Sequence, residues 1–426
     1  MSLEYSALMT KVKDNPDLSF YILYTFLYVF IIGLTNVVNG VVGNNYGWYD
    51  VHFYWENTNF IFEGLWPYRD FNTAYPPFSL AVYLIPYLLA PDEGAFYYTF
   101  TIFTYIFSLL AIHGLLKFCD AKGLDHKYVY ITFLLLIIGV NNFFIARNDT
   151  ITTVFVVLCI LLYWKQKYAP AFIILALGIM TKIYPVFLLP VLLTPFLVKK
   201  DWNSLFRYGL ITVGVCFIIE LPFIINDPST AFNYLSQHSG RGLEIESIVA
   251  IPLMVVSMID PSLVYVGMDE SWDLFGPWAE AVAPFIMPFT LAVILAFMIY
   301  FLVRMWKTDA DLEKRLCLTL MACSVVLMLF MSFNKVFCAQ YVMWIIMLYP
   351  LLIYSFKTFG INYRRLLYHL VALAATSLLT VAFMDGATDG ITIQYLLADI
   401  LKGIAALSLL YYLFKALRTA LDSCSE

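Results

Sequence analysis

The chain has 426 residues, of which 62% are hydrophobic and only 13% are charged, and its mean hydropathy is +0.79. Soluble domains are typically about half apolar and about a quarter charged, so this composition excludes an ordinary soluble protein. The net charge of −5 argues against nucleic acid as a partner, because nucleic-acid-binding proteins carry basic surfaces. No Cys-x-x-Cys pair occurs among the seven cysteines, so the sequence predicts neither a disulfide framework nor a zinc site.

Apolar segments of membrane-spanning length recur along the whole chain. A helix of about 18 or more apolar residues can cross ~30 Å of hydrocarbon. We therefore predict an all-α polytopic membrane protein in which residues 1–426 form a single membrane-embedded domain. The sequence predicts about 12 transmembrane helices, at 18–43, 77–91, 94–117, 128–146, 149–164, 169–198, 205–226, 276–303, 316–333, 336–356, 366–384 and 391–415.

Lysines and arginines in the loops predict the orientation, because cytoplasmic loops carry more of them. The bias favours both termini in the cytoplasm and is clear after residue 199, whereas the basic clusters at 117–127 and 165–167 run against it. In this orientation the two long loops, 44–76 and 227–275, face outward. We expect each of them to contain surface helices.

The first long loop would form an amphipathic helix over 50–64. Its polar face would carry His52, Glu56, Asn59 and Glu63. Its apolar face would carry Val51, Trp55, Thr58 and Phe62. This pattern is typical of a helix that lies at a membrane surface.

Asp50 begins this helix and allows two interpretations. Aspartate is among the best helix N-caps, so Asp50 could simply cap the N-terminus of this helix. Alternatively, a carboxylate at the membrane rim could accept a proton from a substrate hydroxyl. Further along the loop, Arg69 and Asp70 could form a solvated pair, and Tyr75 precedes two prolines that suit the start of the next span.

Several ionisable residues fall inside or at the ends of the apolar segments. Arg147, Asp149, Lys182 and Lys402 are of this kind. Such residues are costly within a membrane and by default indicate function. The alternative is structural: an ion pair, either Asp149 with Lys182 or Arg147 with Asp149, that holds helices together.

The second long loop contains His238 and Arg241 beside two glycines. Arginine binds phosphate through two hydrogen bonds, and glycines let backbone N–H groups approach an anion. An exposed loop with ordinary charges is the alternative. Lys335 and Gln340 open the tenth predicted span, where a lone lysine usually extends toward the interface.

The order of the motifs resembles that of the GT-C membrane glycosyltransferases, and is closest to glycosyltransferase family 87. The stretch Gly64-Leu-Trp-Pro-Tyr-Arg-Asp-Phe71, followed by Tyr75-Pro76-Pro77, carries the resemblance. The later segments RNDT, TKIYP, SGRGLEIES and NKVFCAQYVMW are similar to family landmarks in the same order, so the resemblance covers roughly residues 45–350.

The resemblance implies a GT-C-like fold and an inverting transfer of a hexose, with mannose as the expected sugar. The donor would be a polyprenyl-phosphate sugar, and the acceptor a lipid-linked or membrane glycan on the outer side of a prokaryotic cell membrane. Membrane lipids are the other expected partners. Neither a cofactor nor a metal is expected, because Val51 stands where some GT-C branches have a second acid.

The resemblance and the residue types together give a predicted site. Asp50 would be the catalytic base, and Arg241, His238 and Lys335 would bind the donor phosphate. The residues expected to contact substrate are His52, Glu56, Arg69, Asp70, Tyr75 and Gln340.

Two other functions stay open from the sequence. A flippase or transporter for lipid-linked glycans would use charges near the bilayer midplane, and Lys182, Asp149 and Lys402 are candidates. A ligase or polymerase that moves whole glycans would also have large outer loops.

Overall fold

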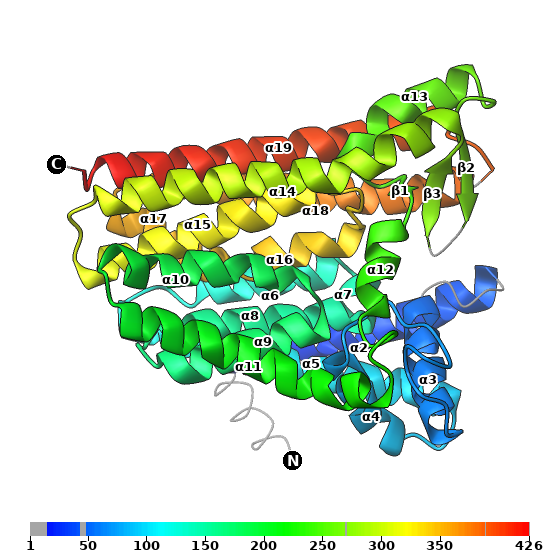
Figure 1. The fold of residues 1–426 in the computed structure, drawn as a ribbon, viewed down its shortest axis with the longest axis horizontal. Helices are drawn as coiled ribbons and strands as arrows, with labels where there is room; N and C mark the ends of the chain where they lie inside the picture. The colour runs from blue at the N-terminus through cyan, green and yellow to red at the C-terminus, as the bar shows by residue number, and fades with distance from the viewer. Residues whose placement is uncertain (1–14, 43–47, 269–270, 388, 426) are drawn as a thin grey trace, which may run out of the picture.

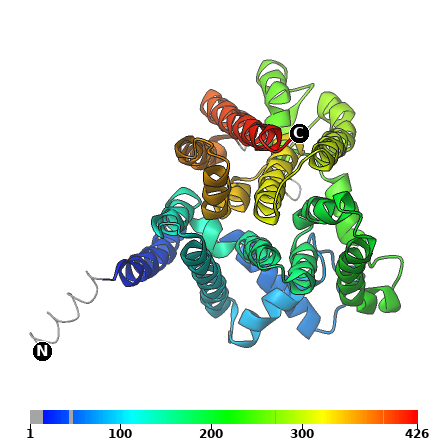
Figure 2. The same cartoon turned by 90° about the vertical axis from the view of Figure 1, so that its left-hand side faces the viewer.

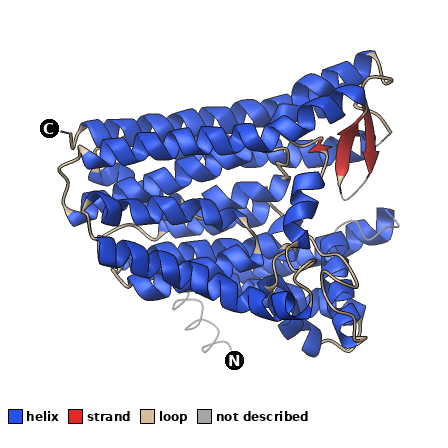
Figure 3. Ribbon diagram, viewed as in Figure 1, coloured by secondary structure: helices blue, strands red, loops and turns tan. Residues whose placement is uncertain are grey.

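The fold is that of a computed structural model, which describes residues 15–42, 48–268, 271–387 and 389–425. Most of these residues form helices that run along one direction in an elongated bundle (Figures 1 and 3). The first half contains α2 (Pro16–Val42), α3 (Tyr49–Phe62), α4 (Phe78–Leu88), α5 (Glu93–Lys122), α6 (Lys127–Gly139), α7 (Asn142–Ala146), α8 (Asn148–Trp164), α9 (Tyr168–Thr181), η2 (Tyr184–Phe187), α10 (Leu188–Val198) and α11 (Trp202–Asn226). The second half contains α12 (Asn233–Gly240), β1 (Leu243–Glu244), η3 (Ile248–Ala250), α13 (Ile251–Ile259), β2 (Tyr265–Met268), β3 (Trp272–Phe275), α14 (Pro277–Trp306), α15 (Leu312–Phe333), η4 (Ala339–Val342), α16 (Met343–Ile346), α17 (Tyr349–Thr358), α18 (Arg364–Met384), η5 (Asp385–Ala387) and α19 (Ile393–Asp422).

The described helices confirm a multi-pass, predominantly α-helical membrane protein. Seven of them are long and apolar enough to cross a membrane, and the count rises to eight if the bent pair Ala339–Ile346 and Tyr349–Thr358 forms one span. The predicted number of 12 is not confirmed, because several predicted spans are shorter apolar helices of 10–17 residues. The chain is therefore a multi-pass membrane protein, and the number of times it crosses the membrane stays a prediction.

Breaks within predicted spans explain the difference. The predicted span 169–198 is interrupted at Lys182, which has extended backbone angles of φ −157° and ψ 132°. Pro185 follows closely and cannot donate a backbone hydrogen bond to the preceding turn. The predicted span 128–146 is divided in the same way into α6 and α7. Hydropathy alone does not reveal such breaks, because the segments on both sides of each break are predominantly apolar.

The 227–275 segment contains strands as well as helices. β1, β3 and β2 form a three-stranded antiparallel sheet in the order β1-β3-β2, with Leu243 opposite Leu274 and Val266 also opposite Leu274. The helices expected in this segment are present as α12 and α13, but the sheet was not predicted. Gly276 adopts φ +103° where β3 leads into α14, a conformation that glycine accepts without steric cost.

Both long loops lie at one end of the bundle (Figure 1). α3 and α4 occupy one side of that end, α13 and the sheet occupy the other, and α12 lies between them (Figure 1). The C-terminus lies at the opposite end, where Thr308 forms a bridge with Ser425. Viewed along the bundle, the α2 helix stands at the periphery of the helix ring (Figure 2). This arrangement brings residues that are far apart in sequence around one space.

Candidate functional site

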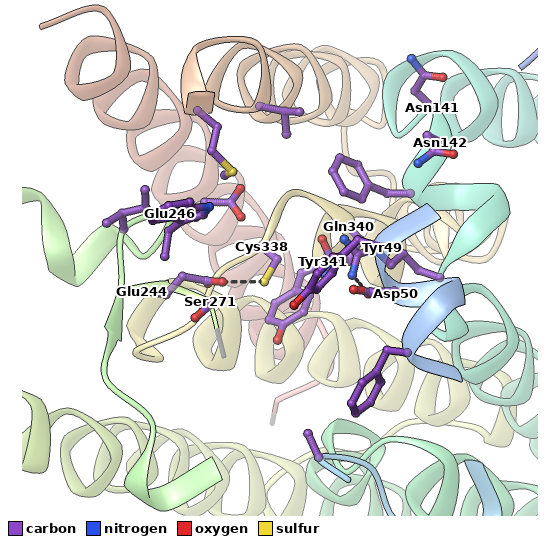
Figure 4. A pocket seen from close by; sticks show the side chains of 18 of the residues that line it. Tyr49, Asp50, Asn141, Asn142, Glu244, Glu246, Ser271, Cys338, Gln340 and Tyr341 are labelled. Carbon is purple, nitrogen blue, oxygen red and sulfur yellow. Dashed lines mark hydrogen bonds and ion pairs between the residues drawn. The ribbon is translucent and has the colours of Figure 1, made fainter. Parts of the chain in front are cut away.

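A cavity of about 910 Å³ lies between α3, the helix breaks and the 227–275 segment. Figure 4 shows Asp50 and Tyr49 on the α3 side of this cavity and Glu244, Glu246 and Cys338 on the other side. Four of the predicted site residues line it: Asp50, Tyr75, Arg241 and Gln340. The cavity is large enough for a sugar with its phosphate, since ligand pockets typically measure about 300–1,000 Å³.

Asp50 is held in the cavity wall by Arg147. The carboxylate of Asp50 and the guanidinium of Arg147 form an ion pair, and their side chains are only 14% and 20% exposed. Tyr54, one helical turn further along α3, lies with its hydroxyl 3.5 Å from the same Asp50 oxygen. A neighbouring positive charge favours the ionised carboxylate, which is the form that can accept a proton.

The N-cap interpretation of Asp50 is wrong. The residue at the N-cap of α3 is Trp48, and Asp50 lies inside the first helical turn. The predicted apolar face is also shifted: Val51, Tyr54 and Thr58 are fully buried, whereas Phe62 is exposed. The buried face of α3 packs against the bundle, and this packing orients Asp50 toward Arg147.

Lys182 and Asp149 form the second ion pair of the cavity wall. Lys182 Nζ lies 2.7 Å from Asp149 Oδ2, and Trp344 donates its indole N–H to Asp149 Oδ1 at 2.9 Å. Of the two pairings considered from the sequence, the structure has Asp149 with Lys182, and Arg147 pairs with Asp50. Lys182 lines the cavity, and Asp149 lies behind it with 1% exposure.

Arg241 lines the opposite wall. Its guanidinium donates to Ser271 Oγ at 3.1 Å and to Glu244 Oε1 at 3.3 Å. Burial disfavours its charge, but four neighbouring groups together outweigh burial and raise the pKa of Arg241 above its ordinary value: Glu244, Cys338, Tyr341 and Asp273. Arg241 is therefore a permanently charged group, 15% exposed, that faces a space able to take an anion.

Lys335 lies behind Arg241, outside the cavity lining. Its ammonium donates to the backbone carbonyl of Arg241, and burial, followed by the charge of Arg241, lowers the pKa of Lys335. The structure thus gives Lys335 a position that supports Arg241 from behind, so its predicted contact with phosphate gains no support. His238 lies in α12, but its side chain is outside the described part of the chain.

The remaining predicted substrate residues lie apart from the cavity. His52 Nδ1 contacts Glu93 Oε1 at 2.6 Å. Arg69 forms the pair with Asp70 that the sequence analysis considered, at 2.8 Å, and this hydrogen bond from Arg69 lowers the pKa of Asp70 to about 2. Glu56 is half-buried on α3. The structure brings none of these four to the cavity lining.

Glu244, Glu246 and Cys338 form a cluster that could hold a metal ion. One ligand atom from each lies within 4.8 Å of the others. Protein groups already engage these atoms: Glu244 accepts from the Phe337 N–H and the Cys338 S–H, and Glu246 accepts from the Ala339 N–H. The ammonium of Lys402 contacts the backbone carbonyl of Glu246. The cluster is therefore a network satisfied from within the protein.

One edge of the cavity is apolar. It is formed by α2 and α18, and its lining residues there are Leu34, Val38, Leu378, Val381 and Met384. Val38 is 45% exposed, so its side chain also faces the surroundings of the bundle. The cavity thus combines a charged interior with an apolar edge between two membrane-type helices.

Sequence reasoning missed Arg147 and Lys182 as parts of the same site as Asp50. It identified both as costly charges in apolar segments, and that cost was the available signal. Non-helical backbone inside a membrane bundle is tolerated where it lines a cavity. Charged residues that stand at breaks between apolar helices, such as these two, therefore mark the cavity.

Comparison with known proteins identifies the family. The model of glycosyltransferase family 87 matches residues 73–332, which is more than half of the chain. No curated protein matches the chain. The matched region includes Arg147, Lys182 and Arg241 and ends just before the Cys338–Tyr341 part of the cavity wall. The chain therefore belongs to glycosyltransferase family 87.

Proposed function

We propose that this glycosyltransferase moves a hexose, with mannose as the first candidate, from a polyprenyl-phosphate donor to a lipid-linked or membrane glycan. One observation carries the proposal: a single cavity holds a carboxylate, cationic side chains and an apolar edge. A polyprenyl-phosphate sugar has a matching set of parts. Its sugar reacts, its phosphate is anionic, and its long chain is apolar.

Asp50 is the proposed catalytic base. In an inverting transfer, Asp50 takes the proton of the acceptor hydroxyl while the hydroxyl oxygen attacks the anomeric carbon. The bond from that carbon to the phosphate oxygen breaks, and the electron pair leaves with the lipid phosphate. A positioned base of this kind typically contributes about 10²–10⁴-fold in rate.

Arg241 is the proposed partner of the departing phosphate. A fixed cation in a water-poor site stabilises charge that develops in the transition state, because it needs no reorganisation. Ser271 and Glu244 hold the guanidinium in place from one side. Tyr75 and Gln340, which also line the cavity, are placed to contact the sugar.

The α2–α18 edge would receive the polyprenyl chain. The chain would pass from the bilayer to this edge without exposure to water, and van der Waals packing against the apolar side chains would hold it there. We propose that the reaction needs neither a cofactor nor a metal, since protein groups already engage the carboxylates that line the cavity. Arg147 pairs with Asp50, and backbone N–H groups donate to Glu244 and Glu246. We place the cavity on the outer side of a prokaryotic membrane, with both termini in the cytoplasm.

The substitution Asp50→Asn tests this function. It removes the base but keeps the size of the side chain, so we expect transfer from a polyprenyl-phosphate sugar to fall at least 100-fold. The measurement is transfer of a radiolabelled sugar by the purified full-length protein, with several polyprenyl-phosphate sugars offered in turn. Donor binding should persist, because the substitution leaves Arg241 in place.

Glu63→Gln is the matched control, since Glu63 is an exposed carboxylate at the end of the same helix. It should retain full activity. A melting temperature of the Asp50→Asn variant close to that of the parent would exclude misfolding as the cause. Full transfer activity in the Asp50→Asn variant would overturn the assignment of the base.

A further inference from the structure

One basic side chain of the cavity wall, Lys182, has no role in the proposed reaction. Three basic side chains line the described part of the cavity: Arg147, Lys182 and Arg241. Arg147 is occupied by the ion pair with Asp50. Lys335 donates to a backbone carbonyl from behind the wall. Lys182 is therefore the basic residue best placed to join Arg241 at an anion.

The surroundings of Lys182 hold its ammonium at the cavity surface. Its nitrogen lies 5.6 Å from the Tyr75 ring centre and 5.2 Å from the Tyr341 ring centre, and both tyrosines line the cavity. Burial raises the pKa of Tyr75, and the charge of Arg241 acts on it in the opposite direction. Arg241 thus lies close enough to influence the same tyrosine that flanks Lys182.

Asp149 orients Lys182 without covering it. An ammonium has three N–H donors, and the hydrogen bond to Asp149 uses one of them. Asp149 is itself fixed by the indole N–H of Trp344, whose ring stacks on Tyr184 with centres 3.7 Å apart. The carboxylate lies behind the cavity wall, so it holds the ammonium from the side away from the ligand.

We propose that Lys182 binds the phosphate of the donor together with Arg241, and that Asp149 is its positioning residue. This inference rests on the proposed function and assigns a new residue to its phosphate subsite. A lipid phosphate monoester or diester placed between the two cations would have a positive group on either side. Hydrogen bonds between charged partners are the strongest that side chains form, so losing one should weaken binding markedly.

The competing explanation is that the pair only holds α8 and the break after α9 together. The stability of a single variant cannot separate the two explanations, because replacing one partner leaves a buried charge without compensation. The double substitution Lys182→Met with Asp149→Asn removes both charges and retains an acceptor for the Trp344 N–H. If the pair is only structural, the double variant should keep its affinity for phosphate. If Lys182 binds phosphate, the double variant should lose that affinity.

The experiment measures binding of a polyprenyl phosphate and of the corresponding polyprenol to the full-length protein in detergent. For the double variant we expect at least a tenfold loss of affinity for the phosphate and unchanged affinity for the polyprenol. Lys182→Arg, which keeps the charge, should retain most of the preference for the phosphate. Lys182→Gln provides the neutral comparison if the double variant does not fold.

The chain offers a matched control in Lys122, Glu313 and Trp164. Lys122 Nζ lies 2.5 Å from Glu313 Oε1, which also accepts the Trp164 indole N–H at 3.2 Å, and neither Lys122 nor Glu313 lines the cavity. Lys122→Met with Glu313→Gln should leave phosphate binding unchanged. Unchanged phosphate affinity in both the Lys182 double variant and Lys182→Gln would overturn the inference.

The outcome separates the inference from the function on which it rests. If the parent protein does not prefer the polyprenyl phosphate over the polyprenol, the proposed donor is wrong. If the parent shows the preference and the Lys182 variants keep it, the donor stands and Lys182 is a structural residue.

Discussion

Two parts of the molecule repeat the same arrangement of a lysine, a carboxylate and a tryptophan. In the cavity wall, Asp149 accepts from Lys182 and from Trp344. Near the end of the bundle that contains the C-terminus, Glu313 accepts from Lys122 and from Trp164. In each group a tyrosine ring lies 5.2 Å from the ammonium.

The surroundings of the two groups differ. Asp149 is 1% exposed and its lysine faces the cavity, whereas the Lys122 and Glu313 side chains are 21% and 35% exposed. Charges in water gain little from pairing, because water already solvates them. The same combination of a lysine, a carboxylate and a tryptophan can therefore belong to a binding site or only stabilise the end of a helix. The solvent exposure of the side chains and their position relative to the cavity make the difference.

The largest expected effect is a difference in the free energy of unfolding that is lost when Asp149 or Glu313 is replaced by alanine. Asp149→Ala leaves Lys182 without its counter-charge and the Trp344 N–H without an acceptor, so we expect a loss of about 3 kcal/mol. Glu313→Ala breaks a pair whose side chains are partly exposed, and should cost less than about 1 kcal/mol. Thermal or denaturant unfolding in the same detergent measures both. Equal losses would show that the exposed fractions do not determine the energies of these pairs.

A smaller effect is expected at the apolar edge of the cavity. Val38→Trp places a large ring in the α2–α18 edge, so it should raise the KM for a donor with a long polyprenyl chain about tenfold by excluding part of the chain. A donor with a chain of only a few carbons should be unaffected. Val37→Trp, at the adjacent outward-facing position with 62% exposure, is the control. The same KM increase for both chain lengths would contradict a chain-binding edge.

The smallest expected effect is a pH-dependent change in stability at Glu246, which lies on the cavity wall opposite Asp50. Burial raises the pKa of Glu246 to about 8; the charge of Lys402 acts against the shift, and Glu244 and Asp399 add to it. The folded state therefore favours protonated Glu246, and this contribution to stability decreases as pH rises from about 4.5 to about 8. Glu246→Gln stays neutral, so its melting temperature relative to the parent should rise by a few degrees between pH 6 and pH 9.

The control for this pH series is Glu280→Gln, because Glu280 is an exposed carboxylate in the first turn of α14. Its melting temperature should follow that of the parent at every pH. A parallel pH course for the Glu246→Gln variant and the parent would mean that Glu246 does not carry the raised pKa.

Much of the fold could be predicted because helix formation in membranes follows local composition. The helix expected over 50–64 is α3, and most predicted spans contain a helix at the expected place. The boundary at Arg147 agrees with the predicted end of the 128–146 span. The break at Lys182 could not be predicted from hydropathy, because it lies inside the apolar segment 169–198. The β1-β3-β2 sheet was missed because its strands have two to four residues, too few for a periodic pattern.

The sequence by itself determined that the chain is a helical membrane protein, that it resembles glycosyltransferase family 87, and that ten residues are candidates for one site. The tertiary structure decided which of them line the cavity: Asp50, Tyr75, Arg241 and Gln340. Only the tertiary structure decided the partners: Arg147 for Asp50, Asp149 for Lys182, and the position of Lys335 behind Arg241. The physical reason is distance. Apolar length and residue type are local properties that can be read along the chain, whereas the energy of an ion pair depends on which distant segments folding brings within a few ångströms.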